Sequence, residues 1–176
     1  MRRWRRTLVN VQNLEQGWES LASADEAWTL AESLLAIELP RRWLHSQGVH
    51  DRAIAVAPTL TVTDAALLAQ AAILHDIGYS KAVLQTGFHP LDGARHLRSL
   101  GIDERVVNLV AHHSCAAIEA HERGLDNALA EFPMGPPALT DALIFCDMTT
   151  SPDGLPVTVD DRLAEIRTRY GDDSIV

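Results

Sequence analysis

Apolar residues recur at helical spacing along most of the chain, and no run alternates with the period of two that is typical of a β-strand. Residues 65–74 are nearly all apolar, so a helix there is expected to be buried on several sides. Ser23, Asp103 and either Thr61 or Thr63 are available as N-caps. The pattern predicts helices over residues 23–39, 40–58, 65–74, 90–100, 103–113, 139–148 and 159–170. We therefore predict an all-α fold.

Prolines and glycines mark the connections between these helices. Residues 124–137 contain two glycines and three prolines, so this segment is expected to be a loop that helps to cover a site. Residues 151–154 have the composition of a turn. A length of 176 residues suits one domain, and neither an internal repeat nor a linker is visible. We predict a compact single-domain helical bundle over residues 21–176, preceded by a basic N-terminal tail and lead-in over residues 1–20.

The charge balance argues against nucleic acid as a partner. Asp and Glu number 24 against 15 Lys and Arg, which gives a net charge of −9. Four of these cations lie in the first six residues, so the rest of the chain carries 11 cations against 24 anions, or −13. Such a body repels a phosphate backbone. We expect a small-molecule partner and no nucleic acid. A homodimer, to which Trp4 could contribute, is not required by any heptad or apolar stripe.

The apolar stretches are too short for a membrane span, which needs roughly 18 to 20 residues. Polar residues follow the N-terminal arginines at once, so we expect no secretory signal there. We therefore expect a cytoplasmic protein with no membrane partner. The two cysteines, Cys115 and Cys146, form no paired motif, and each is expected to be a small buried hydrophobic residue.

Most of the eight histidines lie at the edges of apolar segments: His45, His75, His89, His112 and His113. His75 and Asp76 follow each other at the end of the most apolar helix. An ionised carboxylate beside an imidazole is costly to bury unless a cation is shared, and a metal ion supplies that cation. Histidine and carboxylate ligands without paired cysteines favour iron, manganese or a similar divalent ion over a thiolate-held zinc. The remaining histidines, His50, His96 and His121, are expected at the surface.

Three short segments carry a resemblance to a known family. They read LHS at 44–46, LHDIG at 74–78 and CDM at 146–148, within a likeness that runs from about residue 40 to residue 148. Together they resemble the scattered H…HD…D signature of the HD-domain superfamily of metal-dependent phosphohydrolases. The resemblance implies an all-α bundle in which one divalent ion is held by His45, His75, Asp76 and Asp147.

Two further segments resemble the extra histidines of the two-metal branches of this superfamily. They are FHP at 88–90 with GA at 93–94, and AHHS at 111–114. The resemblance implies that His89 and His112 or His113, or both, hold a second ion that Asp76 bridges to the first. Adjacent helical residues point about 100° apart, so both can bind only where the helix ends or bends. Iron or manganese is expected, with zinc, magnesium, cobalt and nickel as alternatives.

The activity implied is hydrolysis of a phosphomonoester or phosphodiester, from a nucleotide or a related small molecule, by metal-bound hydroxide. Asp76, His112 and His113 are the expected catalytic residues. Lys81 and Arg52 are candidates for binding the substrate, and Arg95 and Arg162 are further candidate cations. Many phosphohydrolases of the superfamily carry Glu or Lys three residues after the HD aspartate, where this chain has Tyr79.

Two alternatives remain open at this point. HD proteins with four histidines and two aspartates can hold a di-iron centre that activates O₂, so an oxygenase acting on a small organic substrate has the same ligand spacing. A ligand-sensing module of the HD type that has lost its metals is the non-catalytic alternative.

Overall fold

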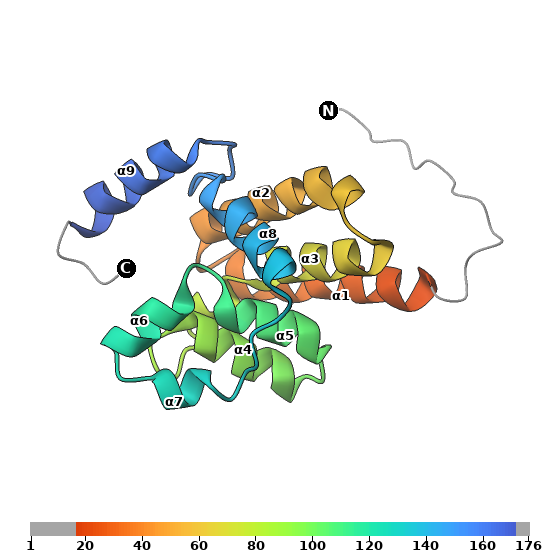
Figure 1. Ribbon diagram of the computed structural model, residues 1–176, viewed down its shortest axis with the longest axis horizontal. Coiled ribbons are helices and arrows are strands. Elements are labelled where there is room, and N and C mark those ends of the chain that lie inside the picture. The colour runs from red at the N-terminus through yellow and green to blue at the C-terminus, as the bar shows by residue number, and fades with distance from the viewer. Residues whose placement is uncertain (1–16, 172–176) are drawn as a thin grey trace.

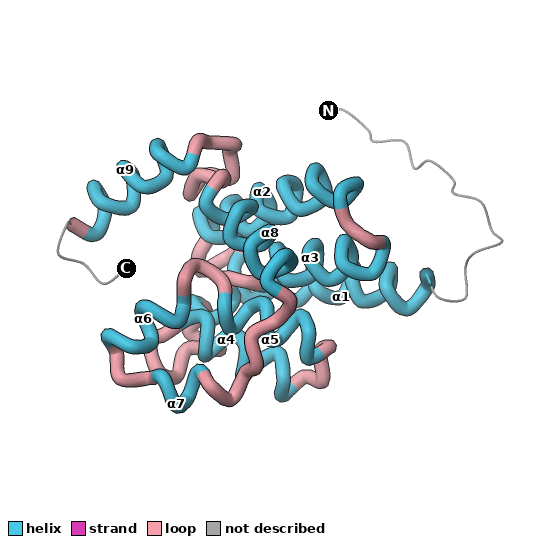
Figure 2. Tube along the Cα trace, in the orientation of Figure 1, coloured by secondary structure: helices cyan, strands magenta, loops and turns pink. Residues whose placement is uncertain are grey.

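The computed structural model describes residues 17–171, and within them every regular element is a helix (Figures 1 and 2). An isolated β-bridge between Thr150 and Pro156 closes the turn at 151–154. The prediction of an all-α fold is confirmed. The basic tail expected over residues 1–20, with Trp4, lies mainly outside the described residues.

All seven predicted helices are present with shifted ends. The elements are α1 (Gly17–Leu35), α2 (Pro40–Val56), η2 (Ala57–Thr59), α3 (Val62–Leu74), η3 (Ile77–Tyr79), α4 (His89–Ser99), α5 (Glu104–His112), α6 (Ala116–Glu122), α7 (Asp126–Leu129), α8 (Pro137–Met148) and α9 (Val159–Tyr170). The described residues thus add two α-helices, α6 and α7, and two short 3-10 helices, η2 and η3. The expectation that residues 124–137 form only a loop is wrong, because α7 lies within them. Short helices of this kind depend on tertiary anchors, here the buried Ala120 of α6 and Leu129 of α7.

Helix α3 lies at the centre of the bundle. It packs against α1, α2, α5 and α8, while α4 and α5 pack on each other beside it (Figure 1). Its residues 67–74 are all buried, including Gln70, as the nearly continuous apolar run predicts. Thr61 is the N-cap, since its hydroxyl oxygen accepts a hydrogen bond from the Asp64 N–H. The C-terminal end of this buried helix therefore delivers the residues that follow it into the interior.

A buried carboxylate fixes the loop that leads into α4. Asp92 is fully buried and accepts hydrogen bonds from the backbone N–H groups of Gln85, Thr86 and Gly87, and from the Thr86 hydroxyl. Hydrogen bonds to a charged group are among the stronger ones in proteins. The loop thus holds a set position directly before His89, the first residue of α4.

Replacing Asp92 with alanine is expected to lower the free energy of unfolding by about 2 to 3 kcal/mol, because four donors lose a charged acceptor. Urea unfolding followed by circular dichroism measures this difference. Asp141→Ala, at an exposed position on α8, is the matched control and is expected to change stability by less than about 0.5 kcal/mol. Equal losses in the two variants would contradict the anchoring role of Asp92.

Candidate metal centre

Six histidine and aspartate side chains from five parts of the fold meet inside the bundle, and each is at most 8% exposed. They are His45 of α2, His75 and Asp76 after α3, His89 at the start of α4, His113 after α5, and Asp147 of α8. The resemblance to the two-metal HD proteins implied these six together with His112.

The first part of the cluster surrounds one oxygen of Asp76. The Asp76 Oδ2 lies 3.5 Å from the His75 Nε2 and 4.0 Å from the His45 Nε2. The His45 Nε2 is also 3.0 Å from the Asp147 Oδ1. The side chains of His45, His75 and Asp76 thus place their ligand atoms within 4.8 Å of one another. Four donor groups of the type that divalent ions bind converge here.

The second part surrounds the other oxygen of the same carboxylate. The Asp76 Oδ1 lies 3.6 Å from the His89 Nε2, which is 3.0 Å from the His113 Nε2. These three residues also offer ligand atoms within 4.8 Å of one another. Asp76 therefore stands between two groups of histidines with one oxygen toward each. That arrangement suits a carboxylate shared by two ions.

The protein backbone sets the orientation of the histidine rings. The Nδ1–H groups of His75 and His113 donate to the carbonyl oxygens of Ala72 and Val110, at 2.8 and 2.6 Å. A carbonyl oxygen can only accept, so the proton of each ring is on Nδ1 and the lone pair of Nε2 faces the cluster. The His75 Nε2 is buried without a hydrogen-bond partner among the described residues. An orphaned nitrogen of this kind is the position that a metal ion would satisfy.

His45 is oriented by the turn at 151–154, whose Ser151 carbonyl oxygen lies 3.0 Å from its Nδ1. This turn packs tightly on α2, since a Cβ added to Gly48 would lie 2.4 Å from the Gly154 carbonyl oxygen. Glycine at both positions therefore permits the approach. The contact aims the His45 Nε2 at Asp147, whose other oxygen accepts a hydrogen bond from the Ser114 hydroxyl.

The ionisation of these groups suits metal binding. Burial lowers the pKa of His113 to about 4, with a further contribution from His75, and burial followed by the charge of His113 lowers the pKa of His89. Both rings are thus neutral at pH 7, as a metal ligand must be. Burial raises the pKa of Asp76, but Arg42 and then the neighbouring histidines outweigh it and hold the pKa well below its usual range. Asp76 is therefore ionised.

The hydrogen bond between His45 and Asp147 shifts the pKa values of both groups. Burial lowers the pKa of His45, but the hydrogen bond to Asp147 and the charges of Asp147 and Asp76 outweigh it, so the pKa is raised. Burial raises the pKa of Asp147, and the hydrogen bond and charge of His45 outweigh that effect and lower it. A pair that holds a proton this strongly offers the same two atoms to a metal ion once the proton leaves.

The side chains of the adjacent residues His112 and His113 point to different parts of the structure. Helix α5 ends at His112, whose ring Nε2–H donates to the Phe132 carbonyl oxygen at 2.7 Å. His113 has extended backbone, with ψ of 167°, and its ring turns into the cluster. The expectation that His112 binds metal or acts in catalysis does not agree with this placement, because its ring is held against the loop at 132.

Replacing His113 with alanine is expected to reduce the bound metal from two ions to one per chain, because the second group of histidines loses one of its two rings. Replacing His112 is expected to leave the metal content unchanged. Elemental analysis of the two purified variants beside the unchanged protein makes the comparison. Loss of metal in the His112 variant and not in the His113 variant would reverse the assignment.

Of the four cations that the sequence suggested as substrate-binding residues, three do not line the cavity beside the cluster. Lys81 is exposed, Arg52 donates to the Thr149 hydroxyl, and Arg95 pairs with Glu131, so none of these three lines the cavity beside the cluster. The predicted role of Lys81 and Arg52 in binding a substrate is not supported by this arrangement. Arg162 does line that cavity.

Arg42 is a candidate functional residue that the sequence pattern did not single out. Its Nη1 donates to the Asp76 Oδ2 at 2.9 Å, and its guanidinium lies 3.8 Å from the centre of the Tyr79 ring. Tyr79 also stacks on His89, with ring centres 4.0 Å apart. Arg42 precedes His45 by three residues, so helical spacing places the two side chains on one face of α2. That spacing was the available signal.

Three of the other sequence expectations are wrong. Cys115 is exposed, and its backbone is left-handed, with φ of 55°, between the end of α5 and the start of α6. His50 is half-buried against Trp28, with ring centres 5.3 Å apart, and His96 of α4 is half-buried as well. Cys146 is buried as expected, and burial raises the pKa of its thiol to about 11. His121 is exposed as expected.

A cavity of about 240 Å³ opens onto the candidate metal-ligating side chains. Asp76, His89 and Asp147 form part of its wall, and Arg42, Arg162 and Arg169 form another part. The cluster is therefore accessible to a small molecule from a side that carries positive charge.

The chain matches the HD domain family over residues 42–148. It is also 40% identical over 78 residues to the tRNA (cytidine(56)-2'-O)-methyltransferase of Thermoplasma volcanium. That alignment covers 44% of this chain, which spans only 22% of the length of the relative. No solved structure matches the chain. Among the described residues, no helix combines the length and the apolar character that crossing a membrane requires.

Proposed function

Because the chain belongs to the HD domain family, we propose that it is a metal-dependent phosphohydrolase that acts on a phosphomonoester or phosphodiester of a small molecule, such as a nucleotide. The observation that carries this proposal is the position of Asp76. Its two oxygens face two separate groups of buried histidines, at 3.5 and 3.6 Å from the nearest Nε2 of each. A bridging carboxylate of this kind is the central element of a two-metal site.

Two divalent ions, with iron or manganese first among the candidates, would share this centre. The first would be held by His45, His75, Asp76 and Asp147, and the second by Asp76, His89 and His113. Bound there, the ions would supply the Lewis acidity that activates water and neutralises charge on a phosphoryl group. The Ser114 hydroxyl fixes Asp147, and Arg42 lies beside Asp76 at the mouth of the site.

The surroundings of the centre support an anionic substrate. The protein as a whole carries a net charge of −9, yet three arginines line the cavity that leads to the cluster. Guanidinium groups bind anionic groups most strongly, and a phosphoryl group is a preferred partner, so the lining favours a phosphorylated substrate. The methyl transfer in the name of the Thermoplasma relative is not carried over, because the aligned residues are a minor part of that protein.

Two measurements on the full chain, purified anaerobically without added metal or chelator, test the proposal. Elemental analysis is expected to find close to two divalent ions per chain. Phosphate release from a panel of nucleotides and phosphodiesters is then expected in the presence of Mn²⁺. Substrate-dependent O₂ uptake without phosphate release would identify the oxygenase instead, and a metal-free protein that hydrolyses nothing would identify the ligand-sensing module.

A further inference from the structure

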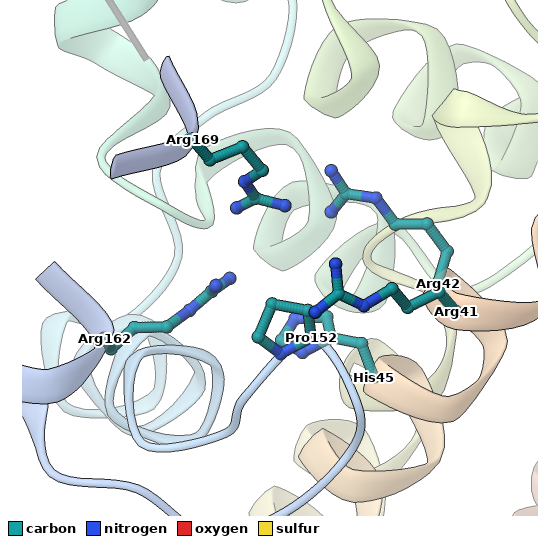
Figure 3. A pocket seen from close by; sticks show the side chains of 6 residues that line it. All are labelled: Arg41, Arg42, His45, Pro152, Arg162 and Arg169. Atoms are coloured by element: carbon teal, nitrogen blue, oxygen red, sulfur yellow. The ribbon is translucent and has the colours of Figure 1, made fainter. Parts of the chain in front are cut away.

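Beside the metal centre lies a second, smaller cavity of about 60 Å³. It is lined by Arg41, Arg42, His45, Pro152, Arg162 and Arg169 (Figure 3). The guanidinium groups of the four arginines point toward a common space, from α2 on one side and α9 on the other (Figure 3). We call this set of four arginines the arginine pocket.

Helix α9 contacts α8 and supplies Arg162 and Arg169 to this pocket. Among its described side chains only Arg162 is buried, with 6% exposure, while Leu163 is exposed and Ile166 half-buried. A helix that packs for stability buries apolar residues, whereas α9 buries a charged one. The Arg162 Nε is buried and has no hydrogen-bond partner within the described part of the chain. A buried guanidinium nitrogen without a partner is costly, and an anion in the pocket would satisfy it.

The carboxylates that contact these arginines are of two kinds. Arg41 pairs with the exposed Asp153, and Glu165 accepts from Arg162 and Arg169. The other two, Asp76 beside Arg42 and Asp147 at 4.0 Å from Arg162, are candidate metal ligands, so ions bound there would share their charge. Converging guanidinium groups of this kind suit a phosphoryl group, which they bind through paired N–H groups.

The pocket adjoins the metal centre directly. Arg42, Arg162 and Arg169 line both cavities, so an anion held among them lies next to any group bound at Asp76 and Asp147. The family match begins at residue 42 and ends at residue 148. Arg41, Arg162 and Arg169 lie outside the matched residues, whereas Arg42 and His45 lie within them.

We infer that the arginine pocket binds a second phosphoryl group of the substrate, one that is not hydrolysed, while the metal centre holds the reacting group. The inference rests on the proposed function and narrows it to substrates that carry at least two phosphoryl groups. Of the two elements that supply the pocket, α9 determines this preference, because it adds Arg162 and Arg169 to a site that is otherwise built by the bundle.

Calorimetric binding to the Mn²⁺-loaded full chain tests the inference without requiring turnover. The probes are methylenediphosphonate, which carries two phosphonate groups and cannot be hydrolysed, and orthophosphate, which carries one group. The same free Mn²⁺ concentration is kept in the cell and the syringe. The substitutions are Arg162→Gln and Arg169→Gln, and the matched control is Arg167→Gln, an exposed arginine of the same helix that lines neither cavity.

Each pocket substitution is expected to weaken methylenediphosphonate binding by about tenfold or more, the effect of losing a charge-assisted hydrogen bond. Orthophosphate binding, which depends mainly on the metal centre, is expected to weaken by a clearly smaller factor, because Arg162 and Arg169 line the cavity of the centre as well as the pocket. Arg167→Gln is expected to change neither affinity. Circular dichroism shows whether each variant is folded, and Arg169, which is less buried than Arg162, provides the second test if the Arg162 variant is not.

Each other outcome has a definite meaning. If orthophosphate binding falls as much as diphosphonate binding, the pocket holds free phosphate and the inference is overturned. If neither falls, the pocket binds no phosphoryl group and the inference is also overturned, even when the protein releases phosphate from its substrates. A protein that binds the diphosphonate through these arginines but hydrolyses no phosphoester would instead contradict the proposed function.

Discussion

Replacing Asp76 with alanine is expected to remove both metal ions and to abolish hydrolysis. The two oxygens of Asp76 face the two groups of histidines, so one substitution takes a ligand from each ion. Changes in the residues behind metal ligands already cost about 10- to 100-fold in metal affinity or activity, and the loss of a shared ligand is expected to exceed this range. The measurements are metal content by elemental analysis and the rate of phosphate release.

The control for this prediction is Asp141→Ala, which removes an exposed carboxylate from α8 and is expected to retain metal and activity. Circular dichroism of the Asp76 variant shows whether the helices are retained, so that metal loss can be separated from unfolding. Two ions per chain in a folded Asp76→Ala protein would mean that Asp76 is not a bridging ligand.

Replacing Gly78 with alanine is expected to have the second large effect. A Cβ at this position would lie 2.0 Å from the His89 carbonyl oxygen, 2.7 Å from the His89 carbonyl carbon and 2.9 Å from the Gly93 nitrogen. All three are backbone atoms, so no side-chain rotation relieves the overlap, and α4 must move away from η3. We expect the free energy of unfolding to fall by about 3 kcal/mol, toward the upper end of what overpacking costs.

The same substitution is expected to lower the affinity for the second ion, because the overlap displaces the backbone of His89, one of its ligands. Urea unfolding and elemental analysis measure the two effects. Gly135→Ala is the matched control, since a Cβ there meets its nearest atoms at an ordinary 3.6 Å. A Gly78→Ala protein as stable as the Gly135→Ala protein would show that α4 and η3 are not locked together.

The helices could be predicted because their causes are local. The periodic apolar positions place one face of each helix inward, and Thr61 and Asp103 mark starts by accepting backbone N–H groups near them in the chain. The short helices α6 and α7 could not be predicted in this way. They hold a few buried residues each, and such lengths are stable only when the rest of the fold packs on them.

Local sequence patterns could not predict whether His112 or His113 faces the cluster. Both follow the same apolar helix, and their order in the chain does not say where that helix ends. The structure ends α5 at His112 and gives His113 an extended backbone, so one ring turns into the cluster and the other toward the loop at 132. A one-residue difference in a helix end depends on tertiary packing.

Local sequence patterns also could not predict that Arg42 and Arg162 lie close together in the fold. Arg42 and Arg162 are 120 positions apart, and each has the sequence surroundings of a solvated helix face. They come together only because the turn at 151–154 brings α9 back across the start of α2 (Figures 1 and 3). The sequence by itself determined the helical class and the candidate H…HD…D ligands, because helical periodicity and ligand chemistry are visible in short segments of the chain. The tertiary structure decided which of the two adjacent histidines faces the cluster and which arginines come together beside it, because those contacts join segments that are far apart in the chain.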